Sequence, residues 1–107
     1  MPDRPRYQLV FAPQTVAHVA AIARKHHDLI RHSITGALSD RPDTVGRSRK
    51  PLDTPGPSDS TWELRFGPGS RFRVFYDIDR DSRAVRILAV GVKVRAQLWV
   101  DGEEFRP

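Results

Sequence analysis

The sequence predicts an α+β fold in which two helices pack on one face of a mainly antiparallel, twisted sheet. Apolar residues recur at helical spacing in the first third of the chain, and alternation of apolar and polar residues takes over in residues 62–79. The predicted order of elements is β-α-α-β-β-β, which is typical of helices gathered on one side of a sheet. With 107 residues, 38% of them hydrophobic, we expect a single domain over residues 1–107 with one modest core.

The first three elements lie before residue 39. Residues 7–11 alternate and then meet Pro13, which predicts a short strand that ends there. Apolar side chains at helical spacing follow from Gln14 onward and predict a helix of about three turns. A second helix is expected over residues 27–38, because leucine and isoleucine continue the spacing until Pro42 disfavours it.

Residues 39–61 separate the helices from the later strands. They are rich in proline, glycine, serine, threonine, aspartate and arginine, and they include the run Thr-Pro-Gly-Pro-Ser at 54–58. Such a composition does not sustain regular structure. We therefore expect a mobile loop here.

A hairpin is expected from residues 62–66 and 71–79 around Gly67-Pro68-Gly69. Alternation assigns the aromatic and aliphatic side chains to a core face, and the other face receives Glu63, Arg65, Arg71, Arg73 and Asp77. If Leu64 pairs with Val74, Arg65 lies opposite Arg73, and facing like charges destabilise a sheet. The pattern therefore predicts an anion between these arginines.

The chain closes with a central strand and a less regular end. Residues 83–92 become apolar on both faces, which is typical of a strand inside a sheet. Residues 93–100 are expected to form a final strand or a short helical turn after a bend at Gly91. Residues 101–107 form an acidic tail.

The net charge of +5 and the pI near 10.4 favour an acidic partner such as nucleic acid or an acidic protein. Fifteen of the 18 basic residues are arginine, which suits bidentate contacts to phosphate, although a GC-rich genome produces the same bias. Without cysteine the chain has no disulfide or thiolate chemistry, and a reducing cytoplasm is expected. No signal peptide and no run of about 18 apolar residues is found, so no membrane association is expected.

Several segments in this order resemble the RelE/ParE superfamily of type II toxin-antitoxin toxins. They are Lys-Pro-Leu at 50–52, Trp-Glu-Leu-Arg at 62–65, Arg-Phe-Arg-Val-Phe-Tyr at 71–76, and Ile-Leu-Ala-Val-Gly at 87–91 followed by Lys93. The resemblance implies a toxin bound by a cognate antitoxin in a hetero-oligomer. RelE-like members cleave mRNA in the ribosomal A site, whereas ParE-like members inhibit DNA gyrase, and a third alternative is an inactive antitoxin-binding homologue. We favour the RelE-like activity, a ribosome-dependent mRNA endonuclease that needs no cofactor.

The resemblance also implies site residues. Arg65, Arg73 and Lys93 match the catalytic positions, whereas Lys50, Arg71, Arg95 and Trp99 are expected to bind RNA or phosphate. Arginine is a poor general base, so Lys93 is the candidate for proton transfer within a cluster of cations.

Two alternatives to a catalytic site stay open. Trp99 stands near the position of a family tyrosine and has no acid-base function, although it can stack on a nucleobase. The arginines can also pair internally with Glu63, Asp77 or the acidic tail. The histidines have no spacing that indicates a metal site, and none is expected.

Overall fold

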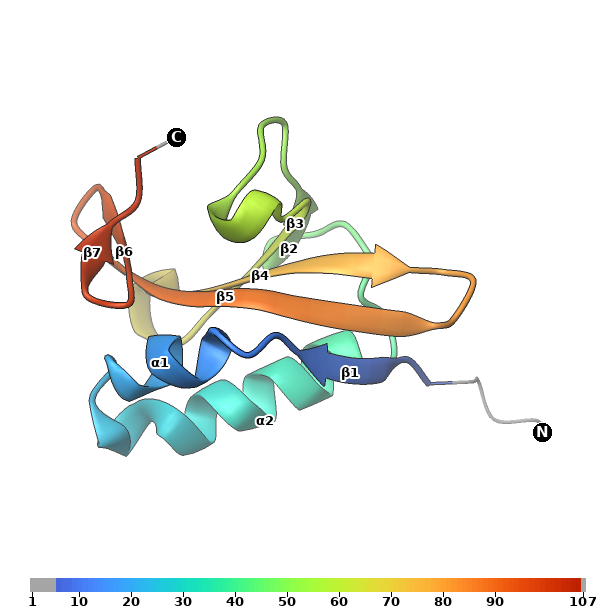
Figure 1. Cartoon of the computed structure of the whole chain (residues 1–107), viewed down its shortest axis with the longest axis horizontal. Helices are drawn as coiled ribbons and strands as arrows, with labels where there is room; N and C mark the ends of the chain where they lie inside the picture. Colours follow the sequence, from blue (N-terminus) through green and yellow to red (C-terminus); the bar gives the residue numbers. More distant parts are fainter. Residues whose placement is uncertain (1–5, 107) are drawn as a thin grey trace.

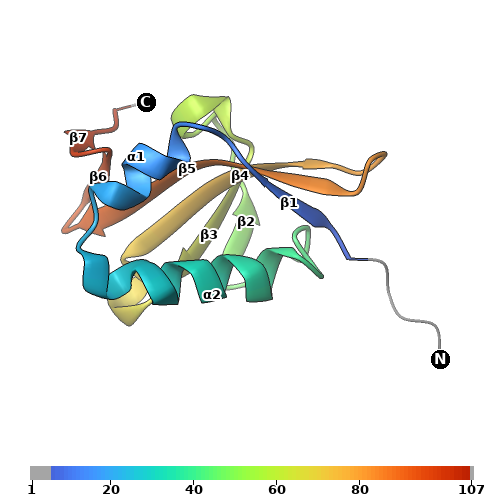
Figure 2. The same ribbon diagram turned by 60° about the horizontal axis from the view of Figure 1, so that its bottom comes forward.

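The computed structural model of the chain describes residues 6–106 (Figure 1), so residues 1–5 and 107 of the predicted domain lie outside it. The elements are β1 (Gln8–Phe11), α1 (Thr15–Ala20), the 3-10 turn η1 (Arg24–His26), α2 (His27–Leu38), β2 (Arg49–Pro51), η2 (Pro57–Asp59), β3 (Trp62–Phe66), η3 (Pro68–Ser70), β4 (Phe72–Asp79), β5 (Ala84–Val94), β6 (Gln97–Val100) and β7 (Glu103–Glu104). Figures 1 and 2 show α1 and α2 on one face of the sheet. The predicted α+β class is confirmed.

The sheet follows the order β2-β3-β4-β5-β6-β7, with antiparallel neighbours, and β1 adds to β5 in parallel. The predicted hairpin has the predicted register, because Leu64 pairs with Val74 and Arg65 with Arg73. Alternation on both strands therefore places Arg65 and Arg73 on the face that points away from α2. This register fixes which side chains can meet at the candidate site.

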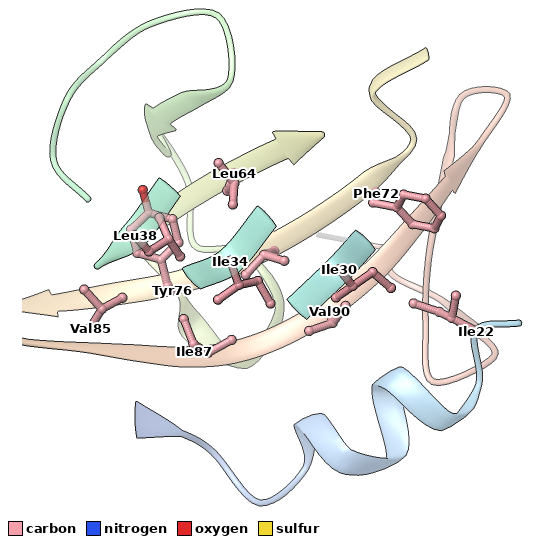
Figure 3. Packing of buried hydrophobic residues seen from close by; sticks show 11 residues of the cluster. Ile22, Ile30, Ile34, Leu38, Leu64, Phe72, Tyr76, Val85, Ile87 and Val90 are labelled. Atoms are coloured by element: carbon pink, nitrogen blue, oxygen red, sulfur yellow. The ribbon is translucent and has the colours of Figure 1, made fainter. Parts of the chain in front are cut away.

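The core lies between α2 and the sheet. Figure 3 shows Ile30, Ile34 and Leu38 of α2 among side chains from β3, β4 and β5. These three residues recur every four positions, so they line one stripe of the helix. Tyr76 is fully buried in this core, and its hydroxyl donates a hydrogen bond to Pro42 O at 2.6 Å. Burial raises the pKa of Tyr76 far above its usual range, so the phenol stays neutral and serves as an anchor for the 39–48 segment.

The helical segment differs from the prediction at its first helix. Six residues form α1, which is shorter than the expected three turns, whereas α2 has the predicted bounds. The chain leaves the helical conformation at Ala23, where φ is −52° and ψ is 134°, before η1 begins. Ile22 is 8% exposed at this corner. The corner lets the chain reverse into α2, and the periodicity of the apolar residues did not reveal it.

Part of the expected loop at 39–61 is ordered as a strand. Arg49–Pro51 pairs with β3 at the edge of the sheet, where a proline is tolerated. Arg49 secures it, because its Nη1 donates to Ala37 O at 2.8 Å and its Nε donates to Thr44 O at 3.2 Å. Only three residues long, β2 carries no local signal and depends on the presence of β3.

The C-terminal segment also differs from the prediction. The strand β5 runs through Gly91 to Val94 without a bend there, and part of the acidic tail forms β7 against β6. A Cβ at Gly91 would lie 2.8 Å from Trp99 O. Glycine is therefore needed at position 91 because the backbones of β5 and β6 approach closely, and not because the strand turns.

Side chains of α1 take the place of a strand along part of β5. One edge of β5 pairs with β1 at residues 84–87 and with β6 at residues 91–94, and α1 fills the interval between them. Gln14 Nε2 donates to Leu88 O at 3.1 Å, and Val90 N donates to His18 Nδ1 at 3.2 Å. Gln14 and His18 are four residues apart, so they project from the same side of α1. They satisfy backbone groups that would otherwise be unpaired.

The His18 contact predicts a pH dependence of stability. Burial lowers the pKa of His18 below the ordinary value of a histidine, against a smaller opposing effect of Asp101. The unfolded chain therefore binds more protons at this site, and the free energy of unfolding should fall as the pH drops below about 6.5. The decrease levels off once the pH is below the folded pKa. Urea denaturation between pH 8 and pH 5 would measure it.

The matched variants are His18→Gln and His32→Gln. Glutamine at position 18 removes the titrating group, so the pH slope should become smaller, whereas His32→Gln makes the same replacement at an exposed position outside the core and controls for the substitution itself. His26 also has a lowered pKa, because of desolvation first and then the charges of Arg71, Lys25 and His27, so part of the slope remains. An unchanged slope in His18→Gln contradicts the assignment.

Candidate nucleic-acid interface

The sheet face that points away from α2 carries a row of charged side chains from four strands, β2 to β5. Lys50 pairs with Glu63, Arg65 with Arg73, and Arg73 with Gly91, so these positions share that face. Lys93 follows Gly91 by two residues on β5 and belongs to it as well. We call this set the arginine face: Lys50, Glu63, Arg65, Arg73 and Lys93. The fold thus brings four of the seven predicted site residues onto one surface.

A carboxylate lies between the two facing arginines. Arg65 Nε donates to Glu63 Oε1 at 2.9 Å, and Arg73 Nη1 donates to Glu63 Oε2 at 3.4 Å. Glu63 is only 7% exposed. The anion predicted between the two arginines is therefore the carboxylate of Glu63. The arginines pair internally with Glu63, which was one of the alternatives left open by the sequence.

The two arginines differ in what they can offer a ligand. Arg73 is 8% exposed and its Nε donates to Ser70 O at 2.8 Å, so it holds the η3 turn as well as Glu63. The side chain of Arg65 is 33% exposed. A guanidinium that is oriented by a carboxylate on one edge still presents N–H donors on its other edges. Arg65 is thus the accessible donor, and Arg73 supports it through Glu63.

Arg71 does not lie on the arginine face, and the expectation that it shares a face with Arg73 is wrong. It precedes β4 and has helical torsion angles, φ −77° and ψ −23°, which interrupt the alternation. Its guanidinium reaches the helical side, with Nη2 at 2.8 Å from His26 Nε2 and Cζ at 4.9 Å from the centroid of the Phe72 ring. Arg71 therefore ties η1 to the start of β4.

Two further predicted residues occupy other parts of the fold. Arg95 is exposed in the tight turn between β5 and β6, with φ at +59°, so it lies beyond the end of the strand that carries Lys93. Trp99 pairs with Val92, and Val92 pairs with Phe72, so the three residues lie on the same face of the sheet. Phe72 belongs to the core beside α2, so this is the face that the helices cover. The half-buried Trp99 indole does not border the arginine face. Stacking on a nucleobase bound at that face is therefore not available to it from this position.

Glu63 was expected on the same face as the arginines and as one of their possible internal partners, but not as a site residue. The signal was present, since Glu63 and Arg65 are two residues apart on one strand and Arg73 faces Arg65 across the hairpin. Within residues 6–106, no three histidine or acidic side chains gather into a possible metal site. No helix in this part of the chain is long and apolar enough to cross a membrane.

The fold has a counterpart among known structures. No family model matches the chain, and no curated protein matches its sequence. A chain of the RelBE2 toxin-antitoxin complex from Mycobacterium tuberculosis has the same fold, with a TM-score of 0.66 and 24% sequence identity over 82% of this chain and 99% of that chain. The chain therefore has the RelE-type α+β fold that the sequence motifs predicted.

Proposed function

We propose that this chain is the toxin of a type II toxin-antitoxin module and that it cleaves mRNA on the ribosome. The observation that carries the proposal is the Arg65–Glu63–Arg73 cluster, which presents an oriented and partly exposed guanidinium on a basic sheet face. Its fold is also that of a chain in a toxin-antitoxin complex. Fold alone does not define an activity, so the argument rests on the site. An mRNA target places the protein in the cytoplasm.

The proposed reaction needs positioned donors for phosphate charge. In a metal-free ribonuclease reaction the 2′-hydroxyl gives up its proton and attacks the adjacent phosphorus. The bond from phosphorus to the 5′-oxygen of the next nucleotide breaks, which leaves a 2′,3′-cyclic phosphate and a 5′-hydroxyl that takes up a proton, and negative charge grows on the phosphate oxygens along the way. Arg65 can donate to those oxygens while Glu63 fixes its orientation, and Arg73 fixes Glu63 in turn. Lys93 lies on the same face and is the candidate for proton transfer.

The proposed partner is an acidic antitoxin that binds the chain in a hetero-oligomer. A net charge of +5 favours such a partner, and the related fold was observed in a toxin-antitoxin complex. In this proposal the antitoxin holds the toxin inactive until it is removed.

A second candidate function is inhibition of DNA gyrase by binding. The observation that favours it is Trp99, which stands near the family tyrosine position and lies on the opposite side of the sheet from Arg73. In that case no proton transfer is needed from the arginine face. An inactive, antitoxin-binding homologue is the third alternative, because Glu63 neutralises part of the charge of the two arginines.

The experiment that tests the proposal is inducible expression in bacteria, with mRNA 5′ ends mapped on translating ribosomes. New ends inside codons within minutes of induction are expected. Growth arrest without new ends contradicts the nuclease and directs the search to gyrase, whose supercoiling activity can be assayed with purified protein. Absence of both arrest and cleavage supports the inactive homologue.

A further inference from the structure

A contact between His26 and Arg71 joins the helical corner to the hairpin that carries the arginine face. Arg71 Nη2 donates to His26 Nε2 at 2.8 Å, and the rings of His26 and Phe72 pack with their centroids 5.0 Å apart. The Arg71 guanidinium also covers the Phe72 ring. Among residues 6–106, the Arg71 guanidinium has no second hydrogen-bond acceptor, and its Nε is buried without one. His26 is therefore the single polar anchor of this side chain.

The contact requires a neutral histidine. Arginine only donates hydrogen bonds, so His26 Nε2 is the acceptor and the ring proton is on Nδ1. A protonated ring has no acceptor nitrogen, and it places a second positive charge next to Arg71. Desolvation, and then the charges of Arg71, Lys25 and His27, lower the pKa of His26. Protonation of His26 therefore breaks the contact.

The surroundings of His26 do not compensate a positive charge on its ring. The charged or titratable groups around it are Arg24 and Lys25 in η1, His27 at the start of α2, and Arg71 before β4. All of them are basic. The nearest acidic residue along the chain is Asp28, which lies 3.8 Å from Arg31 on α2. A charged His26 would thus meet repulsion from both η1 and the hairpin.

The backbone of Arg71 connects this contact to Lys93. Lys93 N donates to Arg71 O at 2.7 Å, one position beyond the Phe72–Val92 pair at the start of β4. The turn before Arg71 is strained, because Ser70 has a φ of 53°, in the left-handed region that residues other than glycine rarely adopt. The anchored side chain of Arg71 therefore helps to hold the carbonyl to which Lys93 is bonded.

We propose that His26 and Arg71 form a pH-sensitive latch that holds Lys93 in place on the arginine face while His26 is neutral and releases it in acid. The inference rests on the proposed function and deepens it, because Lys93 is the candidate for proton transfer there. His26 is a positioning residue, since it acts on Lys93 only through Arg71. The latch is closed above about pH 6.5, the ordinary pKa of histidine, and opens as the pH falls through the lower pKa of His26.

The test is hydrogen exchange of the ¹⁵N-labelled full chain at pH 8 and pH 5, expressed as the protection factor of each amide. The Lys93 amide should lose about tenfold or more of its protection at pH 5, because the charged form of His26 gains tenfold over the neutral form with each pH unit. The Leu52 amide, which donates to Thr61 O at 2.8 Å outside the latch, corrects for any change in global stability.

Two substitutions at position 26 separate the charge from the contact. His26→Gln keeps a hydrogen-bond acceptor and removes the titration, so the protection of the Lys93 amide should be nearly the same at both pH values. His26→Lys is positively charged at both pH values and has no acceptor, so this protection should be low at both. The matched control is His32→Lys at an exposed position of α2, which should behave like the natural chain.

Two outcomes of the exchange experiment overturn the latch. One is a Lys93 amide whose corrected protection does not change with pH in the natural chain. The other is a loss of protection in His26→Gln as large as in the natural chain.

The effect on the reaction is measured with purified protein and programmed ribosomes, as the ratio of mRNA cleavage at pH 6 to cleavage at pH 8. This ratio should be higher for His26→Gln than for the natural chain, because glutamine does not titrate. Equal ratios contradict the control of Lys93 by His26. If no chain cleaves mRNA at either pH, the proposed function fails, and the exchange of the Lys93 amide still decides whether the latch exists.

Discussion

Replacing Arg65 by alanine is expected to abolish growth arrest and to lower mRNA cleavage on ribosomes by about 10²-fold or more. The physical reason is that Arg65 is the exposed member of the Arg65–Glu63–Arg73 cluster, so its donors are the ones that reach phosphate. The fold should persist, because Glu63 keeps its contact with Arg73 when Arg65 is removed. Cleavage is measured by the abundance of new 5′ ends after induction at equal protein levels.

Arg31→Ala is the matched control for Arg65→Ala. It removes the same charge from α2, where the side chain is 72% exposed and lies 3.8 Å from Asp28, away from the arginine face. Cleavage by Arg31→Ala should equal that of the natural chain. Arg65→Lys should fall between the two, because lysine keeps the charge and loses the planar fork. Full cleavage by Arg65→Ala would sink the assignment of the arginine face.

Glu63→Ala is expected to destabilise the chain by about 3 kcal/mol, because it leaves a buried guanidinium without its carboxylate. The side chain of Glu63 is 9% exposed and that of Arg73 is 10% exposed. Neither partner is well solvated, so solvent does not replace the missing contact. Urea denaturation of both chains at pH 7 gives the difference in the free energy of unfolding.

A double-mutant cycle separates the ion pair from other effects of the truncation. In Glu63→Leu with Arg73→Met, no charge of this pair is left buried, so most of the stability lost in the single variants should return. The Asp43→Ala variant is a control, since the exposed Asp43 pairs with Arg80 at 3.5 Å near the surface. Surface ion pairs contribute less than about 1 kcal/mol to the free energy of unfolding. If Glu63→Ala lowers the free energy of unfolding by no more than that, the Arg65–Glu63–Arg73 cluster is not a buried network.

Local patterns in the sequence determined the main elements. The i, i+4 apolar spacing gave the bounds of α2 at His27 and Leu38, and alternation around Gly67 gave the β3–β4 hairpin with its register. Because register fixes which residues share a face, the facing pair of Arg65 and Arg73 followed from the sequence. These features depend on neighbours within about a dozen residues, and such contacts are encoded in adjacent sequence.

Only the tertiary structure decided the features whose partners are distant in sequence. The pairing of β1 with β5, the edge strand β2, and the contact of His18 with Val90 each join segments that carry no common local signal. Arg71 does not lie on the arginine face, because its own backbone is helical just before β4 begins and this interrupts the alternation of the strand. The charge of the site also depends on the tertiary structure. The Glu63 carboxylate contacts both Arg65 and Arg73 only when β3 and β4 are paired and the face that they share is partly buried.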